Sequence, residues 1–362
     1  MFLVNFAARY RHCETMSRLL LYNPDNDLAL ASGLERYTPP AAGRLMAEAG
    51  ALLPLWWAET DDCILADRRL EEDADRLRRH FGLHGSPGMS DDVTEASPWG
   101  WSLAARRRFL DAGLGEASLP SSARIERLRL LSHRRSSITL LRSIGFPAEK
   151  LPAEATTVGR ALDLIAARGG RAAVKQPWSC SGRGVAFTDS MQPEALRRLL
   201  EGWIRRQGSV IIEPLYDRIN EMAALYYADG RGSVTLSGMS AFSCDDRGNY
   251  TGNIVAPQAV VRQLCGNDAV EAAHSLVTPL CSLIGDSYRG WLGVDMLRHR
   301  EGLLPCMELN LRMTMGVVAM LIARRMPADA FPLQLRTVTA PLPGDINLSP
   351  ASSALAIVLR KV

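Results

Sequence analysis

The stretch WLGVDMLRHREGLLPCMELNLRMTMG, residues 291–316, decides the fold, because it contains two apolar runs on either side of a polar turn. The runs cover residues 291–297 and 303–309, which is the pattern of a β-hairpin with Glu301-Gly302 at its tip. A hairpin that is symmetric about this dipeptide places Asp295 directly opposite Glu308.

The hairpin brings together three side chains that suit a metal ion. Asn310 lies two residues after Glu308, so both point to the same face of the strand. Two opposed carboxylates repel each other, and a cation between them removes the repulsion. Asp295, Glu308 and Asn310 are therefore predicted ligands for Mg²⁺ bound together with phosphates. The alternative is a solvated polar face.

A second informative segment contains one of the few lysines. Of the 42 basic residues, only Lys150, Lys175 and Lys361 are lysine. The apolar run 171–176 predicts a strand that carries Lys175 into a loop of small residues at 177–184. Such a loop can wrap phosphate oxygens with its N–H groups, while the lysine supplies a compact charge. The predicted phosphate-binding residues are Lys175, Ser179, Ser181, Gly182, Arg183 and Gly184, and an ordinary turn is the alternative.

A third segment, residues 210–215, reads as a strand that ends in an acid and an irregular stretch. The backbone of Glu213, Pro214 and Leu215 could hold an adenine ring beside an apolar wall, with Glu221 on the ribose hydroxyls. The alternative is an edge strand with solvated acids.

The order and spacing of these segments resemble the ATP-grasp superfamily over about residues 121–325. The gap between Asp295 and Glu308 is similar to that in D-alanine–D-alanine ligases, and the run Glu308–Arg312 resembles the Glu-x-Asn-Pro-Arg run of biotin carboxylases. Two positions depart from these patterns. Leu311 replaces the proline of that run, and Gly293 replaces the arginine of the D-alanine ligases.

The resemblance implies an ATP-dependent carboxylate–amine ligase, or a carboxylate–thiol ligase, that forms an acyl phosphate and releases ADP and phosphate. It implies one or two Mg²⁺ ions, with Mn²⁺ as an alternative. Lys175 and Arg134 would contact the phosphates, and Arg312 would stabilise charge during catalysis. A phosphotransferase and a non-catalytic nucleotide-binding protein are the alternatives.

The resemblance also implies the domain organisation, with a Rossmann-like α/β domain before a two-lobed ATP-grasp fold. The N-terminal domain is expected over residues 17–120 and has no GxGxxG motif. In it, the apolar run 52–58 predicts a strand, and the stretch 86–98, rich in Gly, Pro, Ser and Asp, predicts a loop. The small lobe follows at 121–212, with a predicted helix over 124–144, and the C-terminal lobe with the metal site at 213–326. Residues 327–362 are expected to be an irregular tail. Residues 1–16 are expected to be an extension, with translation starting at Met16.

The candidate substrate residues lie in two polar segments. One follows the first strand, where α/β sheets place ligand loops. The other is a polar loop before the last helix of the C-terminal lobe. The residues are Asn23, Asp25, Asn26, Asp27 and Asn253. The alternative for the first four is a turn or a helix cap.

Composition narrows the classes of partner. The net charge of +3 gives no basic field for nucleic acid. No apolar run is long enough to span a membrane, and the first residues lack a signal-peptide centre. The seven cysteines form no CxxC pair, so reduced thiols in a cytoplasmic protein are expected. The expected partners are a small carboxylate and an amine, and a homodimer is left open.

Overall fold

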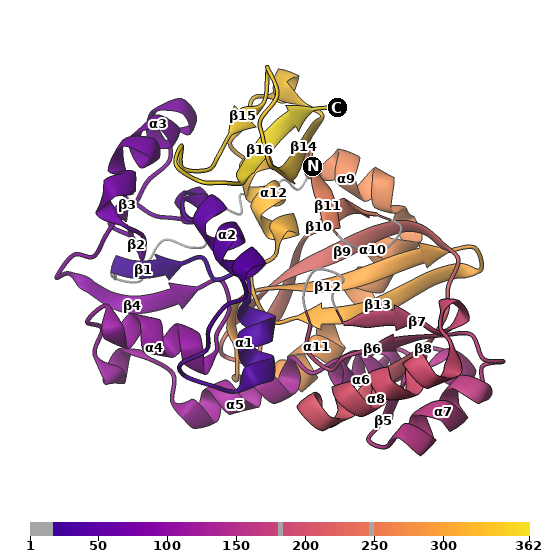
Figure 1. Cartoon of the computed structure of the whole chain (residues 1–362). Helices are drawn as coiled ribbons and strands as arrows, with labels where there is room; N and C mark the ends of the chain where they lie inside the picture. The colour runs from indigo at the N-terminus through magenta and orange to yellow at the C-terminus, as the bar shows by residue number, and fades with distance from the viewer. Residues whose placement is uncertain (1–16, 180–183, 246–249) are drawn as a thin grey trace.

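The computed structural model describes residues 17–179, 184–245 and 250–362, which form three sheets with flanking helices (Figure 1). The expected start at Met16 and the loop residues Ser181, Gly182 and Arg183 lie outside the described residues. A parallel N-terminal sheet is followed by two antiparallel sheets, which confirms the predicted fold class.

The N-terminal sheet has the strand order β3-β2-β1-β4, and all its pairs are parallel. Its core packs leucines of β1 against Phe109 and neighbouring apolar side chains. The strands are β1 (Ser17–Leu21), β2 (Cys63–Ile64), β3 (Ser86–Pro87) and β4 (Val93–Pro98). The helices are α1 (Asn26–Ser32), α2 (Ala41–Ala49), α3 (Glu71–Phe81) and α4 (Leu103–Asp111).

Two sequence expectations for this domain are wrong. The apolar run 52–58 was expected to be a strand, but Leu53–Trp56 is a 3₁₀ turn. Pro54 lies in its first turn, where the missing N–H costs nothing. The stretch 86–98 was expected to be a loop, but it contains β3 and β4. Its Pro and Gly residues hid the short strands, which are held by parallel pairing with β1 and β2.

The second sheet has the order β5-β8-β6-β7 and carries Lys175 at the end of a buried strand. Helices α7 and α8 pack on it through an apolar cluster that includes Leu164 and Leu200. The strands are β5 (Ala153–Ala155), β6 (Ala172–Lys175), β7 (Val185–Phe187) and β8 (Val210–Pro214). The helices of this part are α5 (Ser122–Leu131), α6 (Arg135–Ser143), α7 (Val158–Ala166) and α8 (Pro193–Gln207).

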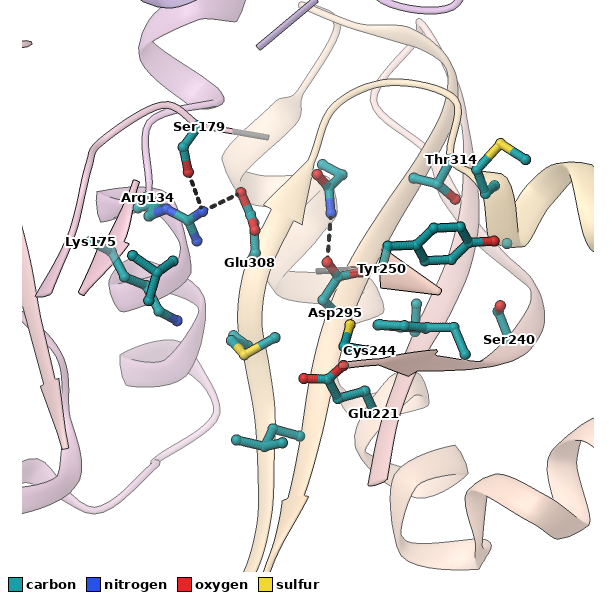
Figure 2. A pocket seen from close by; sticks show the side chains of 18 of the residues that line it. Arg134, Lys175, Ser179, Glu221, Ser240, Cys244, Tyr250, Asp295, Glu308 and Thr314 are labelled. Atoms are coloured by element: carbon teal, nitrogen blue, oxygen red, sulfur yellow. Dashed lines mark hydrogen bonds and ion pairs between the residues drawn. The ribbon is translucent and has the colours of Figure 1, made fainter. Parts of the chain in front are cut away.

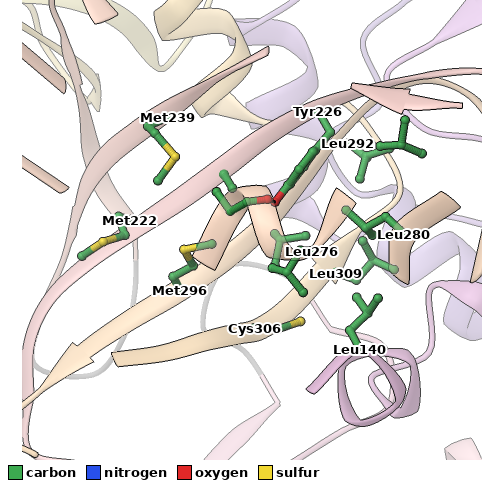
Figure 3. Packing of buried hydrophobic residues seen from close by; sticks show 14 of the residues in the cluster. Leu140, Met222, Tyr226, Met239, Leu276, Leu280, Leu292, Met296, Cys306 and Leu309 are labelled. Carbon is green, nitrogen blue, oxygen red and sulfur yellow. Dashed lines mark hydrogen bonds between the residues drawn. The ribbon is translucent and has the colours of Figure 1, made fainter. Parts of the chain in front are cut away.

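The third sheet is antiparallel, with the order β13-β12-β9-β10-β11-β14-β16-β15. One face packs on α6, α9, α10 and α11 through Tyr226, Leu276 and Leu280 (Figure 3). The other packs on α12. The strands are β9 (Arg218–Asp229), β10 (Val234–Cys244), β11 (Tyr250–Val255), β12 (Arg289–His299), β13 (Gly302–Asn310), β14 (Leu333–Val338), β15 (Ile346–Asn347) and β16 (Ala356–Lys361). The helices are α9 (Gln258–Cys265), α10 (Asn267–Ser275), α11 (Val277–Ile284) and α12 (Met315–Ala323).

The expected irregular tail is also a correction, because residues 327–362 contain β14, β15 and β16. β14 pairs with β11, and β16 pairs with β14, so the tail extends the large sheet. Leu335, Ile357 and Leu359 are fully or almost fully buried. The polar segment around Asn253 was expected to be a loop, but residues 250–255 form β11.

The hairpin register is confirmed where it concerns the candidate metal site. Asp295 pairs with Glu308, and Gly293 pairs with Asn310. Nearer the tip the register changes, since Leu297 pairs with Leu304 and His299 with Gly302. The extra residues of β13 form a bulge next to the site. Symmetry about Glu301-Gly302 therefore holds for the site but not for the turn.

Among the described residues, no helix is both long enough and apolar enough to cross a membrane.

Candidate functional site

A cavity of about 280 Å³ lies where the three sheets meet (Figure 2). Its lining includes most of the predicted site residues, from strands of both antiparallel sheets and from the segment after β13. These residues are Arg134, Lys175, Ser179, Glu213, Pro214, Leu215, Glu221, Asn253, Asp295, Glu308, Asn310 and Arg312. Tyr22, Pro24, Met46 and Trp99 add a wall from the N-terminal domain.

The predicted metal ligands face one another on β12 and β13. Within the described residues, the Asp295 carboxylate accepts one hydrogen bond, from Asn310 Nδ2 at 3.1 Å. Desolvation raises the pKa of Asp295 to about 7, and the nearby Glu308 carboxylate adds to the rise. Arg312 opposes this rise in the pKa. A carboxylate held at such a cost is where a bound cation would be most stabilising.

The donor set fits Mg²⁺ bound together with phosphates. No group of three or more His, Cys, Asp or Glu side chains in the described part of the chain could hold a metal ion. Asp295 and Glu308 with the Asn310 amide thus supply too few oxygens for a closed protein cage. Mg²⁺ is usually held by one or two carboxylates, waters and substrate phosphates. Asp295, Glu308 and Asn310 match that arrangement.

Arg134 connects the small-residue loop to the acidic strand. Its Nε donates to the Gln176 carbonyl oxygen at 2.9 Å, and an Nη donates to Ser179 Oγ at 2.9 Å. The same guanidinium forms an ion pair of 3.0 Å with Glu308 (Figure 2). Arg134 is buried because the predicted helix 124–144 breaks between α5 and α6. The break turns this side chain into the cavity.

The Lys175 side chain is ion-paired, because its Nζ lies 2.5 Å from Glu213 Oε2. Both side chains are buried, at 8% and 6% exposure. The antiparallel pairing of β6 with β8 sets Ala173 opposite Glu213, which brings Glu213 beside Lys175. The acid expected near an adenine ring thus neutralises the lysine.

The loop after Lys175 is framed by Ser179 and Gly184. Gly184 has φ +80°, and a Cβ there would lie 2.7 Å from Gln176 Oε1. Its carbonyl oxygen accepts from the Gln176 N–H at 2.8 Å, closing the loop. This close approach and this backbone conformation favour glycine.

The next wall of the cavity comes from β8 and β9. Pro214 and Leu215 are partly exposed on it, and Glu221 is buried and ion-paired with Arg218. Cys244 of β10 lies between Glu221 and Asp295 in Figure 2. Desolvation raises the pKa of the Cys244 thiol to about 11, so it stays protonated at neutral pH.

Arg312, which follows β13, is linked to helix α1 of the N-terminal domain. An Nη forms an ion pair of 2.7 Å with Asp27, and Nε donates to Asp27 Oδ2 at 2.8 Å. An Nη also donates to Asn310 Oδ1 at 2.8 Å. Asp27 therefore contacts Arg312, next to Asn310, and is not among the residues that line the cavity.

The other early polar residues have structural contacts. Asn23 donates to the Gly100 carbonyl oxygen at 2.9 Å and to Asn26 Oδ1 at 3.3 Å. Both asparagines are buried, and neither lines the cavity. The backbone of Asp25 accepts the first hydrogen bonds of α1. Asn23, Asp25 and Asn26 thus make the contacts of a turn and a helix start outside the cavity lining, and their role toward a substrate stays a prediction.

Sequence reasoning missed that Ser240 and Tyr250 form a hydrogen-bonded group with Asn253 in the cavity wall. Asn253 Nδ2 donates to Ser240 Oγ at 2.7 Å, and the Tyr250 hydroxyl donates to Asn253 Oδ1. Thr314, which also lines the cavity, lies on the same side of the view as Tyr250 (Figure 2). Ser240 occurs in a strand pattern with no motif around it, whereas Tyr250 belongs to the polar segment that was predicted as a loop. Asn253 is thus held in the cavity wall by hydrogen bonds on both its amide nitrogen and its amide oxygen.

We expect Asp27→Asn to lower turnover with a smaller effect on nucleotide affinity. The amide keeps the shape of the side chain but removes the charge that holds Arg312 in place. The assay is steady-state ADP release with calorimetric nucleotide binding. Asp25→Asn is the matched control, because Arg312 pairs with Asp27 and not with Asp25. Equal effects of the two substitutions would contradict a specific role for Asp27.

Solved structures of several enzymes are similar to this fold over nearly the whole chain. Phosphoribosylamine–glycine ligase from Thermotoga maritima is 13% identical, with a TM-score of 0.56 over 95% of this chain and 91% of that one. N5-carboxyaminoimidazole ribonucleotide synthetase from Thermus thermophilus is 15% identical, with a TM-score of 0.53 over 96% and 94%.

A third similar structure holds ligands. The biotin carboxylase domain of 2-oxoglutarate carboxylase from Hydrogenobacter thermophilus is 14% identical, with a TM-score of 0.53 over 97% of this chain and 87% of that one. That domain was solved as a dimer with MgADP, ADP and bicarbonate. No protein-family model matches the chain, and a search of curated proteins found no match.

Proposed function

The chain has the ATP-grasp fold of these three enzymes, and on that premise we propose that it is an ATP- and Mg²⁺-dependent ligase. It joins a small carboxylate to an amine, or to a thiol, through an acyl phosphate. The observation that carries this proposal is the composition of one cavity. Lys175 and Arg134 lie to one side of Asp295 and Glu308 (Figure 2), and Asn310 lies on the same hairpin as these two acids. Cations beside hard oxygen ligands suit a polyphosphate with its metal ion.

The nucleotide is held from the second sheet. Lys175 contacts the α- and β-phosphates, and Arg134 lies next to the acidic strand where the γ-phosphate would reach. Ser179 and Gly184 frame the small-residue loop, and Ser181, Gly182 and Arg183 of this loop are proposed phosphate-binding residues. The segment Glu213–Leu215 borders the adenine, and Glu221 accepts from the ribose hydroxyls.

Asp295, Glu308 and Asn310 would hold one or two Mg²⁺ ions. Bound Mg²⁺ neutralises charge on the β- and γ-phosphates during phosphoryl transfer. Before that, Arg134 must leave Glu308, and Asn310 must turn its amide oxygen away from Arg312. The acidic cluster is thus kept neutralised by side chains that also bind phosphate or substrate.

Arg312 supports the reacting carboxylate and the acyl phosphate. It is fixed by Asp27 and by the Met313 carbonyl oxygen, so its remaining N–H groups are oriented with little freedom. Preoriented donors aimed at developing negative charge lower a barrier more than mobile ones. The amine then attacks the acyl carbon, phosphate leaves, and the amine proton goes to solvent or to the departing phosphate.

The test is a screen of small carboxylates and amines for Mg²⁺-dependent ADP release. We expect one pair to stimulate release, with ¹⁸O moving from the carboxylate into phosphate. A stable phosphorylated product would instead indicate a phosphotransferase. Mg²⁺-dependent ATP binding with no turnover on any pair would indicate a non-catalytic nucleotide-binding protein. Sedimentation of the same sample tests a homodimer, the state in which the biotin carboxylase domain was solved.

A further inference from the structure

A second and larger cavity, of about 1260 Å³, lies between the N-terminal sheet and the large antiparallel sheet. It is lined by β4 and the segment 56–59 on one side and by β9, β12 and the end of α12 on the other. Trp99 lines both cavities, and its carbonyl oxygen accepts from the Met313 N–H at 2.8 Å. The two cavities therefore lie on opposite sides of one wall, next to Arg312.

The lining of this second cavity is rich in tryptophan. Five of the seven tryptophans in the chain border it: Trp56, Trp57, Trp99, Trp101 and Trp291. Trp57, Trp101 and Trp291 remain partly exposed. Tryptophan faces offer large contact areas to apolar and aromatic groups at low entropic cost. Such a concentration in a solvent-accessible cavity is typical of a binding site.

The charges of the second cavity are strongly unbalanced. Six arginines line it and only two acids, Glu59 and Glu95: the arginines are Arg18, Arg124, Arg262, Arg289, Arg324 and Arg325. Arg18 and Arg289 are ion-paired with Asp62 and Glu95.

Among the residues that the structure describes, three of the other arginines have no carboxylate partner. Arg124 donates to the carbonyl oxygens of Asp286 and Ser287, and Arg325 donates to that of Gly82. Arg262 is exposed, and within the described residues it too lacks a carboxylate partner. The uncompensated positive charge calls for an anionic ligand.

Size and backbone favour a peptide over a small molecule. Pockets for drug-sized ligands usually have about 300–1,000 Å³, less than this cavity holds. Residues 95–98 of β4 line it, and β4 is the outermost strand of its sheet. An outermost strand has a row of backbone groups without a strand partner, which an extended peptide can pair with.

We propose that this second cavity binds an extended acidic peptide segment that carries aromatic side chains. The arginines take its carboxylates, the tryptophans take its rings, and the outer edge of β4 takes its backbone. Binding at this site does not depend on the proposed ligase reaction, since none of these groups acts on the nucleotide.

The test is fluorescence polarisation with a labelled peptide of alternating glutamate and phenylalanine, on the full chain saturated with MgADP. We expect saturable binding that falls steeply with salt. Replacing glutamate by lysine, phenylalanine by serine, or alternate backbone N–H groups by N-methyl should each weaken it about tenfold or more. Equal binding of the lysine peptide, or of the N-methylated peptide, would overturn the proposal.

Two substitutions in the second cavity and one control outside it test where the peptide binds. Arg262→Glu should weaken peptide binding about tenfold or more, while Arg197→Glu, an exposed arginine on α8, should leave it unchanged. Trp291→Leu should weaken it as well, with folding checked by nucleotide binding in the first cavity. Unchanged affinity in both cavity variants would overturn the proposal.

Two other occupants would also overturn it. One is 1-naphthyl phosphate displacing the peptide at similar concentration, which would assign the cavity to a small aromatic anion. The other is a dimer that Arg262→Glu dissociates, which would assign it to a second copy of this chain.

Discussion

Asp295→Asn is expected to lower Mg²⁺-dependent turnover by more than about 100-fold. Loss of groups that merely orient metal ligands typically costs 10–100-fold, so removing a direct ligand should cost at least as much. Magnesium affinity in the presence of ADP should fall in parallel. Turnover and Mg²⁺-dependent ATP binding that both survive the substitution would remove Asp295 from the metal site.

The same substitution should make the stability of the metal-free protein less dependent on pH. The pKa of Asp295 rises from 3.8 to about 7, mainly through desolvation. The folded state then holds a proton that the unfolded state has lost, so stability falls as pH rises between about 4 and 7. Above pH 7 the full penalty remains. Asp295→Asn should remove this fall in metal-free protein.

The measurement is thermal unfolding without metal across that pH range. The metal-free variant should be at least as stable as the wild type at neutral pH, although it is inactive. Asp91→Asn, an exposed carboxylate outside the cavity, is the matched control and should keep the wild-type profile. A variant that loses activity together with stability at neutral pH would point to a structural role instead.

The local pattern was enough to predict the core of the site. The pairing of Asp295 with Glu308 followed from two apolar runs and one polar turn, because antiparallel neighbours in a hairpin are close in sequence. Lys175 was found because a buried strand that ends in a lysine is unusual in a chain with so few lysines. The bulge beside Met296 had no sequence signal, so the turn was misplaced while the site was not.

Contacts between distant segments could not be predicted. Asp27 and Arg312 meet only because α1 and the end of β13 pack together in three dimensions. β14 and β16 read as irregular, since prolines and small residues surround them and β11, which joins them to the large sheet, lies far earlier in the sequence. The pairing of Glu213 with Lys175 needed the register between β6 and β8, which single-strand patterns do not contain.

Lys175→Met is expected to lower the free energy of unfolding by about 3–5 kcal/mol, since it leaves Glu213 buried without its partner. Glu213→Leu should cost a similar amount for the converse reason. The double variant should be more stable than either single variant, because an apolar pair replaces the ion pair. Lys150→Met, which breaks an exposed ion pair with Glu301, should change stability by less than about 1 kcal/mol.

Nucleotide binding separates the two roles of Lys175. Every variant that lacks the lysine should bind MgADP at least about tenfold more weakly, including the double variant whose stability has returned. Lys175→Arg should not restore it, because a planar guanidinium cannot place its charge in the space of a compact ammonium beside Glu213. The measurements are urea unfolding and calorimetric titration with MgADP. If the stable double variant bound MgADP like the wild type, Lys175 would be a structural partner of Glu213 and not a phosphate ligand.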